Sequence, residues 1–148
     1  MKTSILFSIL GAIIIAFSSC KSEREKTLEL LRKSPWKMED MISDADADGT
    51  LESVINDCAK EIVYSFKFGR DFYVSNRADS CTTESFPTRN GIWDYIEKED
   101  GDYIVINFPL TLVKFRLDEI TDHQMILFDQ DGYVSSFGYK DIDYIFSR

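Results

Sequence analysis

The stretch IVYSFKFGRDFYVS, residues 62–75, alternates apolar and polar side chains with a period of two. Ile62, Tyr64, Phe66 and Phe68 fall on one face, and Val63, Ser65 and Lys67 fall on the other. Side chains alternate between the two faces of a β-strand in this way. The GRD turn at residues 69–71 reverses the chain, and residues 72–75 return as an antiparallel strand. We predict a β-hairpin here.

Outward from this hairpin, the same alternation recurs between short turns. Further strands are predicted at residues 91–97, 102–108, 110–120, 124–129 and 138–146, and a first one begins at Trp36, where Met38 and Asp40 would share its face. The polar segment 44–49 follows that first strand, and TLESVINDC, residues 50–58, is expected to form a turn of helix. About eight short strands joined by turns indicate an all-β barrel or sandwich. A meander of eight closes most naturally into an antiparallel up-and-down barrel, which removes both exposed edges.

The N-terminus has the features of an export signal. Lys2 precedes an almost wholly apolar run at residues 5–17, which is shorter than the roughly 20 residues of a membrane-spanning helix. The run ends in Phe17-Ser18-Ser19-Cys20, which resembles the bacterial lipobox. That resemblance implies that residues 1–19 are a lipoprotein signal peptide and that Cys20 becomes the acylated first residue. A plain secretory signal followed by an unrelated cysteine is the alternative.

Residues 21–33, KSEREKTLELLRK, favour a short helix that ends before Ser34-Pro35. Glu25, Glu29 and Lys33 recur at helical intervals. Two interpretations stay open at this stage. The segment is either a tether that spaces the domain from a membrane or a helix that caps one end of the fold.

The chain is acidic, with 17 basic and 26 acidic residues and a net charge of −9. Removing residues 1–19 takes away Lys2 alone among the charged residues, so the mature charge becomes −10 (16 − 26). Such a surface argues against nucleic acid and anionic lipid as binding partners. The 129 residues that remain are enough for one domain, residues 34–148, behind the anchor and helix at residues 20–33.

The chain has three cysteines, one in the predicted lipobox and two in the predicted domain. If Cys20 carries lipid, Cys58 and Cys81 remain as a pair, and exported pairs are normally bridged. Closing a loop of this size adds roughly 3 kcal/mol in the chain-entropy model. Two free buried thiols, or half of a metal site, are the alternatives.

Together these features resemble the lipocalin-like lipoprotein domains of Gram-negative bacteria. The resemblance rests on Trp36, the NDC segment ending at Cys58, the IVYSFKF strand, Cys81, Gly91-Ile92-Trp93 and VKFRLDEITDHQMIL at residues 113–127. It covers about residues 34–147, with Ser34-Pro35-Trp36 in place of the usual Gly-x-Trp. It implies a calycin-type β-barrel, and it implies little about function, because most such domains have no assigned ligand.

An acidic loop and a single histidine are the candidates for a metal or catalytic site. Asp44, Asp46, Asp48 and Gly49 match the first half of a calcium loop, but its twelfth position is Ile55 instead of an acid, so a solvated acidic loop is the expectation. His123 is the single histidine, placed in a predicted turn, where it makes neither a zinc site nor a catalytic pair. We therefore predict no metal, no cofactor and no enzyme, since no nucleophile-elbow, phosphate-loop or dinucleotide motif occurs either.

Aromatic residues on the inward faces are the candidate ligand-binding residues. An eight-stranded barrel is either filled by side chains or holds one small ligand. The candidates are Trp36, Tyr64, Phe66, Phe72, Trp93 and Tyr95.

Three functions follow. The first is a barrel that is anchored to a membrane by acyl groups such as palmitate on Cys20 and binds a small apolar or amphipathic ligand. The second is an interaction module of the cell envelope with a filled barrel, and the third is a periplasmic inhibitor that inserts the 76–90 loop into an enzyme. Lys21 follows the anchor in place of Asp, which favours the outer membrane. Both the periplasmic face and the cell surface stay possible.

Overall fold

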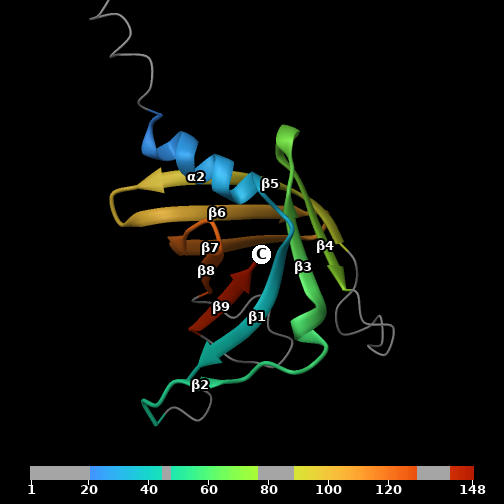
Figure 1. Cartoon of the computed structure of the whole chain (residues 1–148), viewed down its shortest axis with the longest axis vertical. Helices are drawn as coiled ribbons and strands as arrows, with labels where there is room; N and C mark the ends of the chain where they lie inside the picture. The colour runs from blue at the N-terminus through green and yellow to red at the C-terminus, as the bar shows by residue number, and fades with distance from the viewer. Residues whose placement is uncertain (1–20, 45–47, 77–88, 130–140) are drawn as a thin grey trace, which may run out of the picture.

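The structure is a computed structural model that describes residues 21–44, 48–76, 89–129 and 141–148. The predicted signal peptide, Cys20, Cys81, Asp46 and most of the 76–90 loop lie outside these described residues. The fold discussed below is therefore that of the helix and the strands between Lys21 and Arg148 (Figure 1).

Eight antiparallel strands form a closed barrel, which confirms the predicted all-β, up-and-down architecture. Each strand pairs with the next one along the chain, and the last pairs with the first. The strands are β1 (Trp36–Ser43), β3 (Ile62–Phe66), β4 (Asp71–Asn76), β5 (Arg89–Lys98), β6 (Gly101–Phe108), β7 (Thr111–Ile120), β8 (Gln124–Asp129) and β9 (Ile142–Ser147). A two-residue strand, β2 (Glu52–Ser53), extends the sheet beside the end of β1.

The first strand is shared unequally between its two neighbours. It pairs with β9 at five positions from Lys37 to Ile42, but with β3 only through Trp36 opposite Tyr64 and Lys37 opposite Val63. Beyond that point β1 and β3 diverge, and the segment with β2 and a 3-10 turn (Ala59–Glu61) connects them (Figure 1). Ala59 is fully buried and packs in the core beside this divergence.

A bulge in β1 changes which side chains face inward. The register against β9 shifts between Met38 and Asp40, so Met38 and Met41 are both buried although they are three positions apart. The prediction that Asp40 shares the inward face is therefore wrong. Its carboxylate instead accepts hydrogen bonds from the Met41 amide and the Ser53 hydroxyl, which ties β2 to β1.

Three local predictions differ from the structure. Residues 50–58 contain β2 and no turn of α-helix. Phe68 begins a 3-10 turn (Phe68–Arg70) and is 77% exposed, with the Arg32 guanidinium 4.8 Å from its ring centroid, so it does not continue the inward face. Leu110 lies in the turn before β7, and β9 begins at Ile142, after the predicted start at 138.

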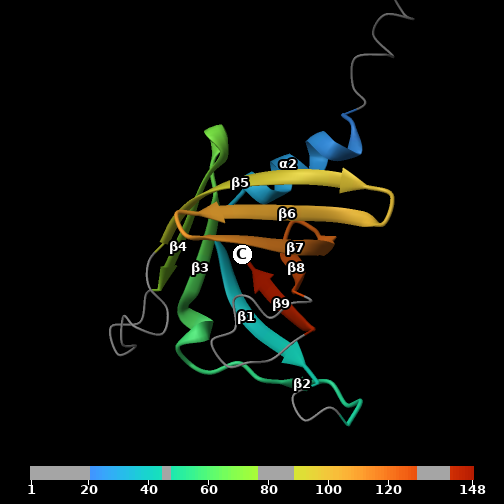
Figure 2. The same ribbon diagram turned by 180° about the vertical axis from the view of Figure 1, so that it is seen from behind.

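The helix α2 (Glu23–Arg32) closes one end of the barrel, which favours the capping interpretation over a free tether. Its first turn is a capping box, in which the Ser22 hydroxyl accepts from the Glu25 amide and the Glu25 carboxylate accepts from the Ser22 amide. Leu31 is fully buried in the barrel core. Figure 2 shows α2 lying along β5 at this end, and Arg24 donates to the Tyr95 carbonyl oxygen there. In the described part of the chain, no helix has the length and apolarity needed to cross a membrane.

Candidate ligand-binding end of the barrel

The two ends of the barrel differ, and we name them by what covers them. The capped end is the one beneath α2, where Trp36 of β1 and Tyr95 of β5 are hydrogen-bonded to the helix. The opposite end, where β1, β4, β6 and β8 finish, has no α-helix over it among the described residues, and we call it the open end (Figure 1).

At the capped end, both indole N–H groups and the Tyr95 hydroxyl have protein partners, whereas the buried Arg32 Nε has none among the described residues. The Trp36 indole N–H donates to the Leu31 carbonyl at 3.1 Å, and the Trp93 indole N–H donates to the Lys67 carbonyl at 3.2 Å. The Arg148 guanidinium lies 5.1 Å from the Trp36 ring centroid. Tyr95 donates to the Asp102 carboxylate at 2.6 Å, and burial, followed by this hydrogen bond, raises the pKa of Tyr95 to about 12.

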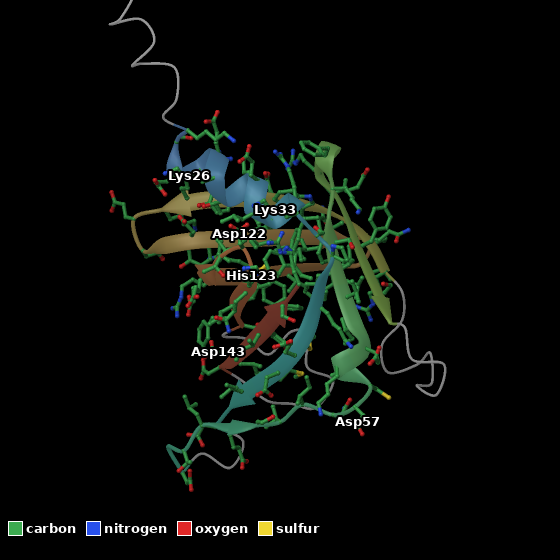
Figure 3. All side chains as sticks on the ribbon, in the orientation of Figure 1. Lys26, Lys33, Asp57, Asp122, His123 and Asp143 are labelled. Carbon is green, nitrogen blue, oxygen red and sulfur yellow. The ribbon has the colours of Figure 1, made fainter. Side chains whose placement is uncertain are left out.

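An ion pair fixes α2 to the strand turns below it. Lys33, directly after the helix, pairs with Asp122 in the turn between β7 and β8, and Figure 3 shows the two side chains close together. The Lys33 hydrogen bond and charge lower the pKa of the Asp122 carboxyl. His123 beside it is exposed in this turn, as its position in the sequence indicates.

The six candidate ligand-binding residues are all buried in the barrel core. Four of them form a chain of ring contacts: Tyr64 meets Phe72 at 5.2 Å, Phe72 meets Phe66 at 4.9 Å, and Phe66 meets Trp93 at 5.3 Å between centroids. Trp36, which lies opposite Tyr64 in the β1–β3 pairing, and Tyr95 are each hydrogen-bonded at the capped end. The structure thus brings four candidates together, and a ligand-binding role for the six stays a prediction.

At the open end, two polar side chains are buried inside the barrel. Ser43 and Asp129 are the last residues of β1 and β8, and they are 0% and 1% exposed. Asp129 lies opposite Ile142, the first residue of β9, and Ser43 follows Ile42, which pairs with Asp143 on the same strand. Both polar side chains therefore flank the start of β9, where it enters the barrel.

Two tyrosines face this buried acid. Tyr144 is 1% exposed and points inward from β9, with its ring 5.8 Å from that of Phe115. Burial raises the pKa of Tyr64 and of Tyr144 far above the usual range, and the negative charge of Asp129 contributes to both shifts. We call Ser43, Tyr64, Asp129 and Tyr144 the polar cluster.

The Tyr144 hydroxyl is the unusual member of this cluster. It is buried, and no hydrogen-bond partner for it occurs among the described residues. A buried hydroxyl without a partner costs roughly 1–3 kcal/mol, so native structures rarely leave one unsatisfied. The hydroxyl is therefore available to an atom that enters the barrel.

The side chains lining the open end are smaller than those at the capped end. Gly91 faces inward there, and a Cβ on it would lie 2.9 Å from the Asn107 carbonyl oxygen and 3.1 Å from the Phe108 ring. Phe108 leans over this glycine and meets Phe72 at 6.0 Å, and Val74 and Val113 complete the same region. At the rim, the exposed Arg89 lies 6.0 Å from the Phe108 ring centroid.

Sequence reasoning missed Ser43, Asp129 and Tyr144 as site residues. A signal for Asp129 was present, because the alternation in residues 124–129 places Met125, Leu127 and Asp129 on one face. A carboxylate on an otherwise apolar inward face is uncommon. The bulge in β1 hid the inward position of Ser43, since the simple period of two is broken before it.

A second feature of the open end lies on the outside of the barrel. Ile92 and Leu112 both pair with Asn107 in neighbouring strands, and Tyr73 lies diagonally beside Ile92. With Leu110, which is 98% exposed at the turn, they form what we call the rim patch. A hollow of about 450 Å³ opens beside it, lined by Asn90, Gly91, Ile92, Asn107, Phe108 and Pro109.

The predicted metal and cysteine features have the following places. Asp44 accepts from the Gly49 amide at 2.9 Å and Asp48 accepts from the Thr50 amide, so these carboxylates shape the loop they lie in. Across the described ranges, no group of three or more His, Cys, Asp or Glu is arranged to hold a metal ion. Cys58 is disulfide-bonded, and since Cys81 lies outside the described residues, its pairing with Cys81 stays a prediction.

Comparisons with protein-family models, with curated proteins and with solved structures found no match.

Proposed function

We propose that the protein is a lipid-anchored, lipocalin-like lipoprotein whose barrel binds a small amphipathic ligand through its open end. The observation that carries this proposal is the Tyr144 hydroxyl, which is buried inside the barrel without a hydrogen-bond partner among the described residues. Binding sites for small molecules are largely apolar and contain a few placed polar groups, which is the composition of this region.

The contrast with the capped end supports the direction of entry. Both tryptophans, Trp36 and Trp93, are satisfied by backbone carbonyls and covered by α2 or by cationic side chains. A ligand would have to displace the helix to enter there. At the open end the lining is smaller, and the buried polar groups lie where the strands finish.

The proposed anchor lies close to the fold. Only Lys21 and Ser22 separate Cys20 from the first residue of α2, and Ser22 already belongs to the capping box. Acyl groups on Cys20 would therefore hold the capped end near the membrane and leave the open end facing away from it. Two or three acyl chains anchor a protein stably, whereas one binds marginally. We propose the outer membrane as the location, in line with Lys21 after the anchor.

Lipidation is tested by metabolic labelling with palmitate. The wild-type chain should incorporate label and fractionate with membranes, and Cys20→Ala should do neither. Cys58→Ala is the matched control, because it removes a cysteine that lies in the folded domain, and it should keep the label. Label that persists in Cys20→Ala would overturn the anchor without affecting ligand binding.

Ligand binding is tested on the chain from Lys21 onward, which contains every described element of the barrel, with its fold checked by near-UV circular dichroism. Native mass spectrometry of this protein, purified from its own host, should show a bound small molecule. It should also enhance the fluorescence of the uncharged apolar probe N-phenyl-1-naphthylamine. A protein that carries no molecule and binds no probe would overturn the proposed function.

A second candidate, an envelope interaction module, is favoured by the rim patch. Three exposed apolar side chains on neighbouring strands, together with Leu110 in the turn before β7, form a surface of the kind used in protein contacts. In vivo photocrosslinking from position 110 should then capture one protein partner, and Leu112→Lys should abolish the product. Crosslinking that is unchanged by Leu112→Lys would contradict this function.

A further inference from the structure

A hollow of about 240 Å³ opens beside the helix at the capped end, and we call it the α2 hollow. It is lined by Lys21, Glu25, Leu28, Glu29 and Arg32. We propose that the α2 hollow binds the head group of a zwitterionic phospholipid, with the phosphate on Arg32 and the ammonium against Glu29. This site rests on the proposed function only for the anchor on Cys20, which would bring the hollow to a membrane.

Arg32 is the cation of the α2 hollow that has no acidic partner. Its guanidinium lies over two aromatic rings, 4.8 Å from the Phe68 centroid and 5.8 Å from the Trp93 centroid. Its Nε is buried without a hydrogen-bond partner, and within the ranges that the structure describes no ion pair or hydrogen bond to this guanidinium occurs. Because a guanidinium carries five N–H donors, most of its hydrogen-bonding capacity is open to a ligand.

The other charged groups of the hollow already have partners. Lys21 pairs with Glu29 at 2.5 Å between Nζ and Oε1. The Glu25 carboxylate accepts from the Ser22 amide in the capping box. A ligand that enters the hollow therefore finds an unpaired guanidinium beside carboxylates that stay acidic, and the hollow presents both signs of charge.

This pattern of charge favours a zwitterion over a simple anion. Glu29 and Arg32 are three positions apart, which puts their side chains next to each other on the helix, about 5–6 Å apart at Cβ. A phosphate and an ammonium joined by an ethylene group, as in phosphatidylethanolamine, span a similar distance. Arginine often holds a phosphate through two parallel N–H···O bonds. A carboxylate has about four lone-pair sites, so Glu29 can accept from the ammonium as well as from Lys21.

Size and net charge agree with this ligand. Sites that enclose a drug-sized molecule measure roughly 300–1,000 Å³, so the α2 hollow suits a head group and leaves the acyl chains outside. The acidic charge of the chain opposes an anionic membrane. A zwitterionic head group carries no net charge, and its ammonium would meet the two glutamates that a second negative charge would find repulsive.

Phe68 gives the acyl chains a place beside this head group. It lies in the turn between β3 and β4 and is 77% exposed. Figure 1 shows this turn and α2 at the same end of the molecule, and the Arg32 contact joins them. Lys21, which lines the hollow, directly follows Cys20 in the sequence. Acyl groups on Cys20 would thus place the hollow among lipid head groups, with the Phe68 ring against the apolar layer. Segments that lie at a membrane interface combine cations and apolar rings in this way.

Head-group binding is tested by amide chemical shifts on the chain from Lys21 onward, with glycerophosphoethanolamine as the probe. This compound has no acyl chain, so it does not enter the barrel as an amphiphile. It should shift the amides of α2 and bind roughly 2- to 5-fold more tightly than glycerophosphoglycerol, which has the same phosphodiester but no ammonium. Glu29→Gln should remove most of this preference.

Arg32→Gln should weaken both compounds by roughly 10-fold, the effect of losing hydrogen bonds from a charged donor. Arg24→Gln is the matched control on the same helix, because Arg24 already donates to the Tyr95 carbonyl and pairs with Glu97. It should leave both affinities unchanged. Equal affinities of the two compounds, shifts that avoid α2, or unchanged binding in Arg32→Gln would overturn the inference. If Arg32→Gln fails to fold, the preference lost in Glu29→Gln, a side chain 53% exposed, still decides it.

The membrane itself is tested with the full chain, purified from its host membranes, in vesicles of phosphatidylcholine and phosphatidylethanolamine with brominated acyl chains. Bromine should quench the fluorescence of Phe68→Trp, and it should leave the added fluorescence of Leu110→Trp, at the open end and 98% exposed, unquenched. Quenching at position 110, or at neither position, would overturn the inference and keep the anchor. If Cys20 proves to carry no lipid, the proposed anchor fails, whereas the head-group titration still decides the α2 hollow.

Discussion

The capped end and the open end are built from the same eight strands, yet their side chains differ in size and in hydrogen bonding. At the capped end, large aromatic rings fill the barrel and each indole N–H reaches a backbone carbonyl. At the open end, Gly91, Val74 and Val113 line the barrel beside Phe108, and the buried Tyr144 hydroxyl has no partner among the described residues. The first arrangement stabilises the fold, and the second costs stability.

This difference indicates that the capped end contributes more to the free energy of unfolding than the open end does. Proteins retain unsatisfied buried groups mainly where function requires them. Four changes, taken from the largest expected effect to the smallest, test whether the two ends differ in this way.

The largest effect is expected at the capped end. Trp36→Ala should lower the free energy of unfolding by about 4 kcal/mol, because it removes a fully buried ring and its hydrogen bond to Leu31. Urea unfolding followed by circular dichroism measures it. Phe108→Ala, at the open end, should cost no more than roughly half as much, since its ring is only half-buried. Equal losses of unfolding free energy in the two variants would contradict the difference between the two ends.

Alkaline pH should act on both ends at once. The pKa values of Tyr64, Tyr95 and Tyr144 are all raised in the folded state, whereas tyrosines in the unfolded chain titrate near pH 10. The folded state therefore holds these protons more tightly, so stability is complete below about pH 10 and falls above it. At about pH 10.5 the loss should reach roughly 2 kcal/mol for the three residues together.

Urea unfolding at about pH 8 and at about pH 10.5 measures this loss, and absorbance at 295 nm follows the phenolates directly. Of the seven tyrosines, Tyr64, Tyr95 and Tyr144 should ionise late, because burial raises the pKa of each. A single titration of all seven near pH 10, with the fold intact, would show that the cores of both ends admit water freely.

Gly91→Ala tests the wall of the open end. The new Cβ would meet the Asn107 carbonyl oxygen at 2.9 Å, a backbone atom that cannot turn aside, so we expect a loss of about 2 kcal/mol in unfolding free energy. Asn90→Ala, the exposed neighbour, should change stability by less than about 0.5 kcal/mol. If Gly91→Ala is equally mild, Phe108 and its strand are free to move, and this wall is looser than described.

The smallest effect has the opposite sign. Tyr144→Phe should raise the unfolding free energy of the ligand-free protein by about 1 kcal/mol, since it removes an unsatisfied buried hydroxyl. Tyr95→Phe, which loses the hydrogen bond to Asp102 at the capped end, should lower it by about the same amount. Thermal unfolding of both variants gives the comparison directly. A loss of stability in Tyr144→Phe would mean that its hydroxyl is already satisfied.

Much of the fold was predictable because it depends on local pattern. The alternation in residues 62–75 and its repeats along the chain gave the strands, and their short turns gave the order that closes into a barrel. The errors fall where the chain departs from a period of two. The bulge before Asp40, the 3-10 turn at Phe68 and the short β2 each depend on partners distant in the sequence.

The open end was harder to predict for a physical reason. The aromatic residues were predicted to bind a ligand because large inward side chains can be recognised in the sequence. Large side chains, however, mainly fill the interior of a barrel. Ser43 and Tyr144 are ordinary residues whose burial only the closed barrel imposes, and the Tyr144 hydroxyl is buried without a hydrogen-bond partner among the described residues. Asp129 was the exception, since its inward position could be read from residues 124–129 alone.

The unequal pairing of β1 has a consequence for local unfolding. With only two registered pairs to β3, against five to β9, the β1–β3 seam breaks at the lowest cost in ladder hydrogen bonds. The Tyr64–Phe146 ring contact spans this seam from inside the barrel. Native-state amide exchange should therefore release β3 from β1 before the β5–β6–β7 ladders open. The barrel then opens first at the β1–β3 pairing, and the strand edges exposed by this opening begin at Trp36 and Tyr64.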